Sequence, residues 1–122
     1  MNAALILTLA LAAPGDRALL QAIRQVETGG QPNGGRDAVG DGGRSIGPYQ
    51  LQRAYHADSG VPGTYEQCRD REYAERVVRA YWRRYCPRGS DEVKARTHNG
   101  GRLGPKKAAT LKYWKKVQRA MR

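Results

Sequence analysis

The sequence predicts an α+β fold that is mainly helical, with a small β-hairpin between the first helix and the rest of the chain. Apolar residues recur at helical spacing in several separate segments. Eight glycines and two prolines lie between residues 29 and 48, which is typical of a loop or tight hairpin. The 122 residues are enough for one compact domain but not for two.

Residues 1–13 are predicted to be a secretory signal segment that precedes a single domain over residues 14–122. The run from Ala3 to Ala13 is apolar apart from Thr8, and it is too short to span a bilayer, which needs about 20 residues. Ala10-Leu11-Ala12 fits the small-x-small rule for signal cleavage. No Lys or Arg precedes the run, so a buried or frayed N-terminal helix is the alternative. A cleaved signal would place the protein outside the cytoplasm, secreted or periplasmic.

The first helix is expected from Arg17 to about Glu27, with Asp16 as its N-cap. Its apolar side is formed by Leu19, Leu20, Ile23 and Val26. In the glycine-rich segment that follows, Val39 and Ile46 flank a G-D-G-G-R-S stretch and predict a small two-stranded ribbon.

Further along the chain, we expect a short helix over 48–53, a turn region over 58–63 and a central helix from about 70 to 85. In the central helix Tyr73, Val77, Tyr81 and Tyr85 recur every four residues, which is typical of a buried helix face. Two more helices are expected over 91–97 and 108–119, separated by a turn at Asn99-Gly100-Gly101.

The two cysteines, Cys68 and Cys86, lie at opposite ends of the predicted central helix. A helix between them would hold them about 27 Å apart, because each residue adds about 1.5 Å. A disulfide needs Cα atoms within about 7 Å, so we expect unpaired thiols unless the helix is broken. Neither a metal site nor a cofactor is indicated by the residue pattern.

The net charge of +11 implies an anionic partner, because 22 Lys and Arg face only 11 Asp and Glu. Nucleic acid, anionic lipid and an acidic polymer such as a bacterial cell-wall surface are the candidates. Aromatic residues lie among basic ones at 81–85 and 112–116, a pattern that suits nucleic acid. The predicted export and the lack of a recognisable nucleic-acid module argue against a specific nucleic-acid partner.

Glu27 is the first candidate catalytic residue. It lies four residues after Ile23, on the apolar side of the first predicted helix and in its last turn. The helix dipole and burial both favour a neutral carboxylic acid there, and this is the form that a glycosidase needs in its general acid. An exposed glutamate without a role is the alternative.

A second carboxyl group would have to come from the glycine-rich segment, which offers Asp37 and Asp41. Glycosidases place a second Asp or Glu across the scissile bond. Asp41 sits in G-D-G-G, where the backbone can turn sharply and approach a ligand. Asp beside Gly is also ordinary turn chemistry, so a purely structural role is the alternative.

Several segments together resemble the invertebrate-type, or destabilase-like, lysozyme family and its bacterial relatives. In order, they are Val26–Gly30, Gly40–Leu51, Tyr55, Asp58, His98–Gly101 and Tyr113-Trp114. The G-P-Y-Q-L and H-N-G-G stretches are the most specific. The resemblance implies a lysozyme-like fold and hydrolysis of the β-1,4 bond between N-acetylmuramic acid and N-acetylglucosamine in peptidoglycan glycan strands, with no cofactor.

The same resemblance assigns provisional roles. Glu27 matches the family's catalytic acid, and Asp41 best matches its second carboxylate, with a one-residue shift that leaves Asp37 as a competitor. Residues that would line a sugar cleft are Tyr49, Gln50, Tyr55, His98 and Asn99. For the two tyrosines core packing is the alternative, and for His98 and Asn99 it is a capping turn beside the cleft. We expect a monomer.

Two features depart from the family pattern. Animal members carry several disulfides, whereas this chain has two cysteines and Ile46 stands where a Cys usually precedes G-P-Y-Q. Arg102 follows H-N-G-G in place of Pro. The fold would therefore depend on its apolar core, as in the bacterial relatives.

Two other functions stay open at this point. Gly43 to Gly47 fits the G-x-S-x-G nucleophile pattern, but the chain is too short for the α/β sheet that gives this motif its meaning. Because some family members are credited with isopeptidase activity, Ser45 acting with His98 is a minor alternative. A non-catalytic, cationic peptidoglycan- or nucleic-acid-binding protein is the other.

Overall fold

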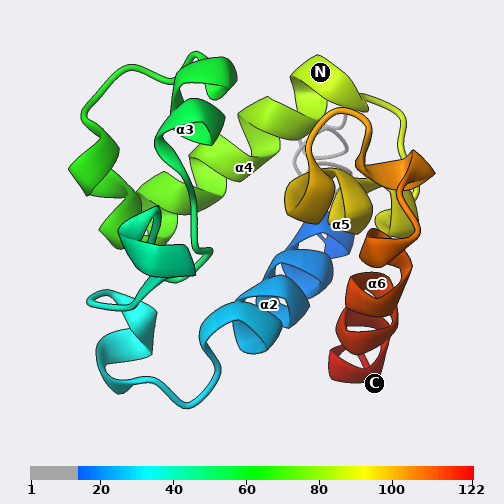
Figure 1. Cartoon of the computed structure of the whole chain (residues 1–122), viewed down its shortest axis with the longest axis horizontal. Coiled ribbons are helices and arrows are strands. Elements are labelled where there is room, and N and C mark those ends of the chain that lie inside the picture. The colour runs from blue at the N-terminus through cyan, green and yellow to red at the C-terminus, as the bar shows by residue number, and fades with distance from the viewer. Residues whose placement is uncertain (1–13) are drawn as a thin grey trace, which may run out of the picture.

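The computed structural model describes residues 14–122, so the predicted signal segment, 1–13, lies outside the described residues. The described part is mainly helical with one small antiparallel hairpin, which confirms the predicted fold class (Figure 1). Its helices are α2 (Pro14–Thr28), α3 (Arg53–Ser59), α4 (Arg71–Tyr85), α5 (Asp91–Gly100) and α6 (Ala109–Ala120). The strands are β1 (Val39–Gly40) and β2 (Ser45–Ile46), and short 3₁₀ helices cover 32–35, 41–43, 65–69 and 104–106.

Helix α2 carries the predicted apolar stripe, with Leu19, Leu20 and Ile23 buried. Asp16 lies inside its first turn rather than at the N-cap, because the helix already includes Pro14. The Asp16 carboxylate instead accepts a hydrogen bond from Lys94 Nζ at 3.0 Å. This ion pair ties the beginning of α2 to α5.

The hairpin after α2 is antiparallel, with Val39 opposite Ile46 and Gly40 opposite Ser45. Its turn needs left-handed backbone at Gly42 and Gly43, where φ is +65° and +91°, a conformation that glycine adopts without steric cost. The two-stranded ribbon predicted from the glycine-rich segment is therefore confirmed.

The helix predicted over 48–53 is wrong. Gly47 and Gln50 have φ of +78° and +52°, which no right-handed helix allows. The segment is a tight turn closed by backbone hydrogen bonds between Ile46 and Leu51. The helix in this region, α3, begins only at Arg53.

The central helix α4 confirms its prediction. Asp70 caps its N-terminus by accepting the Tyr73 backbone N–H at 2.9 Å, and its buried face is Tyr73, Ala74, Val77, Val78, Ala80, Tyr81 and Trp82. Cys68 and Cys86, on either side of α4, are both buried and free, as predicted.

Helix α5 runs to Gly100, three residues beyond the predicted end. His98 and Asn99 therefore lie in its last turn and not in a separate turn, and the chain leaves the helix at Gly101, where φ is +80°. The apolar residues of α6 are only partly buried. Val117 is fully enclosed, whereas Leu111 and Met121 are exposed.

Helices α2, α5 and α6 pack together, while α3 packs on α4 (Figure 1). The hairpin and α3 lie on one side of the view, and α5 and α6 lie on the other, with the C-terminal end of α2 between them. None of the helices within residues 14–122 is long and apolar enough to cross a membrane.

Candidate active site

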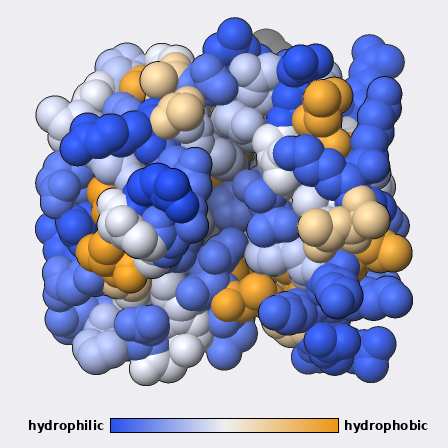
Figure 2. All heavy atoms as spheres, in the orientation of Figure 1, coloured by the Kyte–Doolittle hydropathy of each residue, from blue (hydrophilic) through white to orange (hydrophobic). Residues whose placement is uncertain are grey.

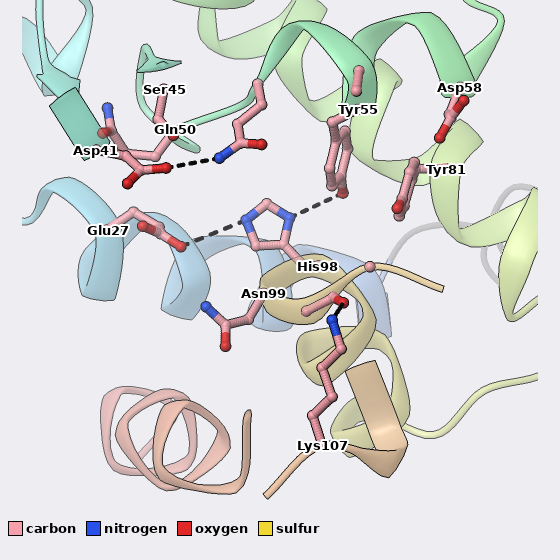
Figure 3. Close-up of a pocket in the computed structure, with 14 residues that line it drawn as sticks. Glu27, Asp41, Ser45, Gln50, Tyr55, Asp58, Tyr81, His98, Asn99 and Lys107 are labelled. Atoms are coloured by element: carbon pink, nitrogen blue, oxygen red, sulfur yellow. Dashed lines mark hydrogen bonds and ion pairs between the residues drawn. The ribbon is translucent and has the colours of Figure 1, made fainter. Parts of the chain in front are cut away.

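A cleft of about 540 Å³ opens between the hairpin and α3 on one side and α5 on the other. Figure 2 shows the molecule hollowed there, on a face that is otherwise mostly hydrophilic. Of the residues that the sequence singled out, the cleft brings together Glu27, Asp41, Gln50, Tyr55, His98 and Asn99. These residues come from α2, the hairpin, the turn after it, α3 and α5 (Figure 3).

Glu27 reaches the cleft from the last turn of α2, and its side chain is 20% exposed. Its Oε2 atom accepts a hydrogen bond from the Tyr113 hydroxyl at 2.8 Å. His98 Nε2 faces the same oxygen at 3.6 Å. Within the described residues all of these contacts are at Oε2, so Oε1 is left for a substrate or a proton.

His98 links Glu27 to an aromatic pair. Its Nδ1 is hydrogen-bonded to the Tyr55 hydroxyl at 2.9 Å, and the Tyr55 ring stacks on Tyr81 with centroids 3.8 Å apart. Burial raises the pKa of Tyr55 well above its usual value, so its hydroxyl stays protonated, and whether it donates to Nδ1 or accepts from it is set by the imidazole tautomer. The other ring nitrogen, Nε2, faces Glu27 (Figure 3).

Tyr113 also keeps its proton. Burial is the main cause of a pKa raised well above the usual value, and the neighbouring Glu27 carboxylate acts in the same direction. The hydroxyl is therefore a permanent hydrogen-bond donor to Glu27 at any pH near neutrality. Together Tyr113 and His98 hold the carboxyl group in one orientation.

Asp41 lies across the cleft in the hairpin turn, with φ of +52° and a side chain 48% exposed. Its Oδ1 pairs with Arg44 at 3.2 Å, and its Oδ2 accepts from Gln52 Nε2 at 2.9 Å. Asp37 is exposed, accepts a hydrogen bond from Asn33 Nδ2 at 3.5 Å, and is not among the residues that line the cleft. The geometry thus favours Asp41 over Asp37 as the partner of Glu27.

Tyr49 lies in the core rather than in the cleft, which agrees with core packing, the alternative stated for this residue. It is fully buried, and its hydroxyl donates to Glu75 Oε2 at 2.7 Å. Gln50 does line the cleft, but its amide nitrogen is used within the hairpin region, where it donates to Gly47 O at 3.0 Å and Ala38 O at 3.3 Å. Its amide therefore braces the wall of the cleft.

The structure adds residues that the sequence did not single out for the site. Tyr113 could not be paired with Glu27 by any local pattern, because 86 positions separate them. Tyr81 was predicted to be core only; it is buried, yet one edge lines the cleft. Lys107 donates to Gly100 O at 2.7 Å and closes the end of α5 beside the cleft.

Ser45, the residue of the G-x-S-x-G motif, is buried and lines the same cleft. A serine nucleophile needs a base within hydrogen-bond reach. Both ring nitrogens of His98 are directed elsewhere, Nδ1 to Tyr55 and Nε2 to Glu27. His98 therefore has no ring nitrogen left to activate Ser45 as a base.

The chain is similar to animal lysozymes over most of its length. It is 36% identical to "Invertebrate-type lysozyme 6" of Caenorhabditis elegans, covering 81% of this chain and 82% of that protein. It is 40% identical to a lysozyme of Magallana gigas, covering 82% and 76%. No family model matches the chain.

Solved structures agree with these relatives. The crystal structure of Tapes japonica lysozyme superposes with a TM-score of 0.73 at 32% identity, covering 87% of this chain and 92% of that one. Meretrix lusoria lysozyme, solved in complex with Aeromonas hydrophila PliI, superposes with a TM-score of 0.72 at 32% identity, covering 88% and 93%.

Proposed function

Because this chain belongs to the invertebrate-type lysozyme family and is a lysozyme-type glycosidase, we propose that Glu27 is its general acid. The bond it cleaves is the β-1,4 linkage between N-acetylmuramic acid and N-acetylglucosamine in peptidoglycan. The observation that carries the assignment is that Glu27 and Asp41 line one cleft from two different elements. Two carboxyl groups flanking the scissile bond are what this reaction requires.

The proton to be delivered would sit on Oε1 of Glu27. Tyr113 and His98 contact Oε2, so Oε1 is the oxygen left to meet bound glycan. Protonating the glycosidic oxygen makes the departing sugar a neutral alcohol as the bond to the anomeric carbon breaks. Tyr113 and His98 act as positioning residues, because they hold the carboxyl group without touching the reacting atoms.

Asp41 would assist the substitution at the anomeric carbon. It would either attack that carbon directly or remove a proton from the attacking water, and these choices retain or invert its configuration respectively. Arg44 and Gln52 hold its two oxygens in the hairpin turn. The sugar rings would contact Tyr55 and hydrogen-bond to Asn99, whose side chain is exposed at the end of α5 and lines the cleft.

The same proposal covers where the protein works. A monomer exported by the segment 1–13 would meet peptidoglycan outside the cytoplasm, and the +11 charge would hold it on the anionic wall. Degrading that wall would make the protein antimicrobial. The isopeptidase alternative is disfavoured because His98 has no free nitrogen for Ser45.

The test is lysis of purified cell walls by the wild type and by Glu27→Gln. Glu66→Gln is the matched control, because Glu66 is exposed and outside the cleft. We expect lysis to be lost only in Glu27→Gln, with release of new reducing ends by the wild type. Lysis retained in Glu27→Gln would mean that Glu27 is not the general acid, and no lysis by the wild type would indicate a binding module. Ser45→Ala should leave release of reducing ends intact.

A further inference from the structure

A second hollowed region lies along α2 and the beginning of α4, and we call it the arginine groove. It consists of two adjoining hollows of about 290 and 410 Å³. Its basic residues are Arg17, Arg24, Arg36, Arg69, Arg71 and Arg79. Arg24 and Arg71 line both hollows and make them continuous, and no residue of the groove lines the cleft.

The arginines of the groove are poorly neutralised. Among the described residues only Arg69 of the six forms an ion pair, with Glu66. The acidic lining residues are Asp70, Glu72 and Glu75. Asp70 is committed to the α4 N-cap and Glu75 accepts from Tyr49. The lining therefore has three more positive than negative charges, and little competes with an incoming anion.

Arg24 is incompletely hydrogen-bonded inside the protein. Its Nε is the one buried side-chain nitrogen or oxygen without a hydrogen-bond partner in the part of the chain that the structure describes. A buried, charged donor left without an acceptor is costly. An oxyanion seated where the two hollows join would instead meet the parts of Arg24 and Arg71 that line both hollows, since this nitrogen is itself enclosed by protein.

The lining also indicates the kind of anion. Guanidinium groups bind phosphate bidentately, and one phosphate can accept from several arginines at once. Two hollows in succession suit a chain with repeated charges better than a single ion. No aromatic residue lines either hollow, so the groove lacks the rings on which nucleic-acid bases stack.

We infer that the arginine groove is a binding site for a phosphodiester-linked polyol chain of the bacterial wall, separate from the glycan-binding cleft. The choice of a wall polymer rests on the proposed function; the phosphate site itself does not. By holding such a chain, the groove would keep the enzyme on the wall while the cleft releases one glycan and binds another.

The experiment measures binding of the full protein to purified poly(glycerol phosphate), with poly-glutamate and single-stranded DNA as comparison polymers. Arg36→Gln/Arg71→Gln removes two exposed groove arginines. Arg88→Gln/Arg119→Gln is the matched control, because it removes two exposed arginines outside both groove and cleft. We expect the groove variant to bind poly(glycerol phosphate) about tenfold or more weakly, and the control to change by less than about twofold.

Each outcome decides the proposal. Equal losses in the two double variants would mean that net charge alone binds the polymer, and the site would be wrong. Equal affinity for poly-glutamate would overturn the phosphate assignment, and tighter binding of DNA would overturn the wall polymer. Hydrolysis of a neutral chito-oligosaccharide should be unchanged in both variants. Because none of the polymers is cleaved, binding is read independently of whether the catalytic proposal holds.

Discussion

The catalytic cleft and the arginine groove have opposite charge, although the chain as a whole is strongly basic. Lys107 is the single Lys or Arg lining the cleft, against the carboxylates of Glu27, Asp41 and Asp58. The groove has six arginines against three carboxylates. Within the described residues, Glu27 thus forms no ion pair with a Lys or Arg, whereas Asp41 pairs with Arg44.

This separation has a chemical reason. A guanidinium beside a carboxyl group favours its ionised form, and an ionised general acid has no proton to give. Glu27 instead has the uncharged hydroxyl of Tyr113 and the imidazole of His98 as neighbours. On the proposed assignments, attraction to an anionic wall and protonation of a sugar oxygen would therefore come from different surfaces, and substitutions should affect them separately.

Substituting the second carboxylate should separate glycan hydrolysis from polymer binding most strongly. Asp41→Asn should lower the rate of glycan hydrolysis about 100-fold or more, the usual scale for losing such a group, without weakening polymer binding. Asp37→Asn should cost little, because Asp37 is outside the cleft. Reducing-end assays on both variants measure this, and a silent Asp41→Asn with a damaging Asp37→Asn would mean that the second carboxylate is misassigned.

Removing the Tyr113 hydroxyl should have a smaller effect. Tyr113→Phe deletes the 2.8 Å hydrogen bond to Glu27, and losing a hydrogen bond worth about 1.4 kcal/mol would lower kcat about tenfold. KM should stay nearly constant, since the hydroxyl positions the acid and does not bind sugar. Tyr85→Phe is the control; a rise in KM with unchanged kcat would instead make Tyr113 a substrate-binding residue.

Raising the salt concentration should weaken retention on the wall several-fold more than it slows hydrolysis in the cleft. Exposed charges are screened within about 8 Å at physiological ionic strength and within about 3 Å at 1 M. Retention on whole walls should therefore fall as salt rises, while turnover of a short neutral chito-oligosaccharide should hardly change. Sedimentation and hydrolysis assays over one salt series measure both, and an equal response would show that the cleft depends on the same charge.

The smallest expected effect is on alkaline stability. Tyr113 has a raised pKa in the folded protein, so the unfolded chain loses this proton first, near pH 10. The free energy of unfolding should then fall as pH rises above 10, by about 1.4 kcal/mol per pH unit for each such tyrosine. Urea unfolding between pH 9 and 11.5 should show a shallower fall for Tyr113→Phe, and identical slopes would contradict the shift.

The helices were predictable because their information is local. Apolar spacing located α2 and α4, and Asp70 before α4 is a recognisable cap. The error at 48–53 has a local cause that composition does not reveal, namely the positive φ of Gln50. For α5, Asn99-Gly100 is typical of a turn, yet the helix continues through both residues.

The candidate site was only half predictable. Glu27, Asp41 and His98 could be singled out by their chemistry and the family resemblance, and the structure brings all three to one cleft. The partner of Glu27 could not, because the Tyr113 contact depends on how α6 packs against α2. The arginine groove was likewise visible only as net charge, since its residues come from four separate stretches of the chain.

The two thiols that flank α4 have a consequence for where the protein can fold. Because Cys68 and Cys86 are free and buried, the described domain is held together by packing and not by an oxidised cross-link. Burial raises the pKa of the Cys68 thiol to about 11, which leaves almost none of the thiolate through which cysteines react. The fold should therefore be indifferent to redox potential, and it can form as well in a reducing cytosol as in an oxidising exterior.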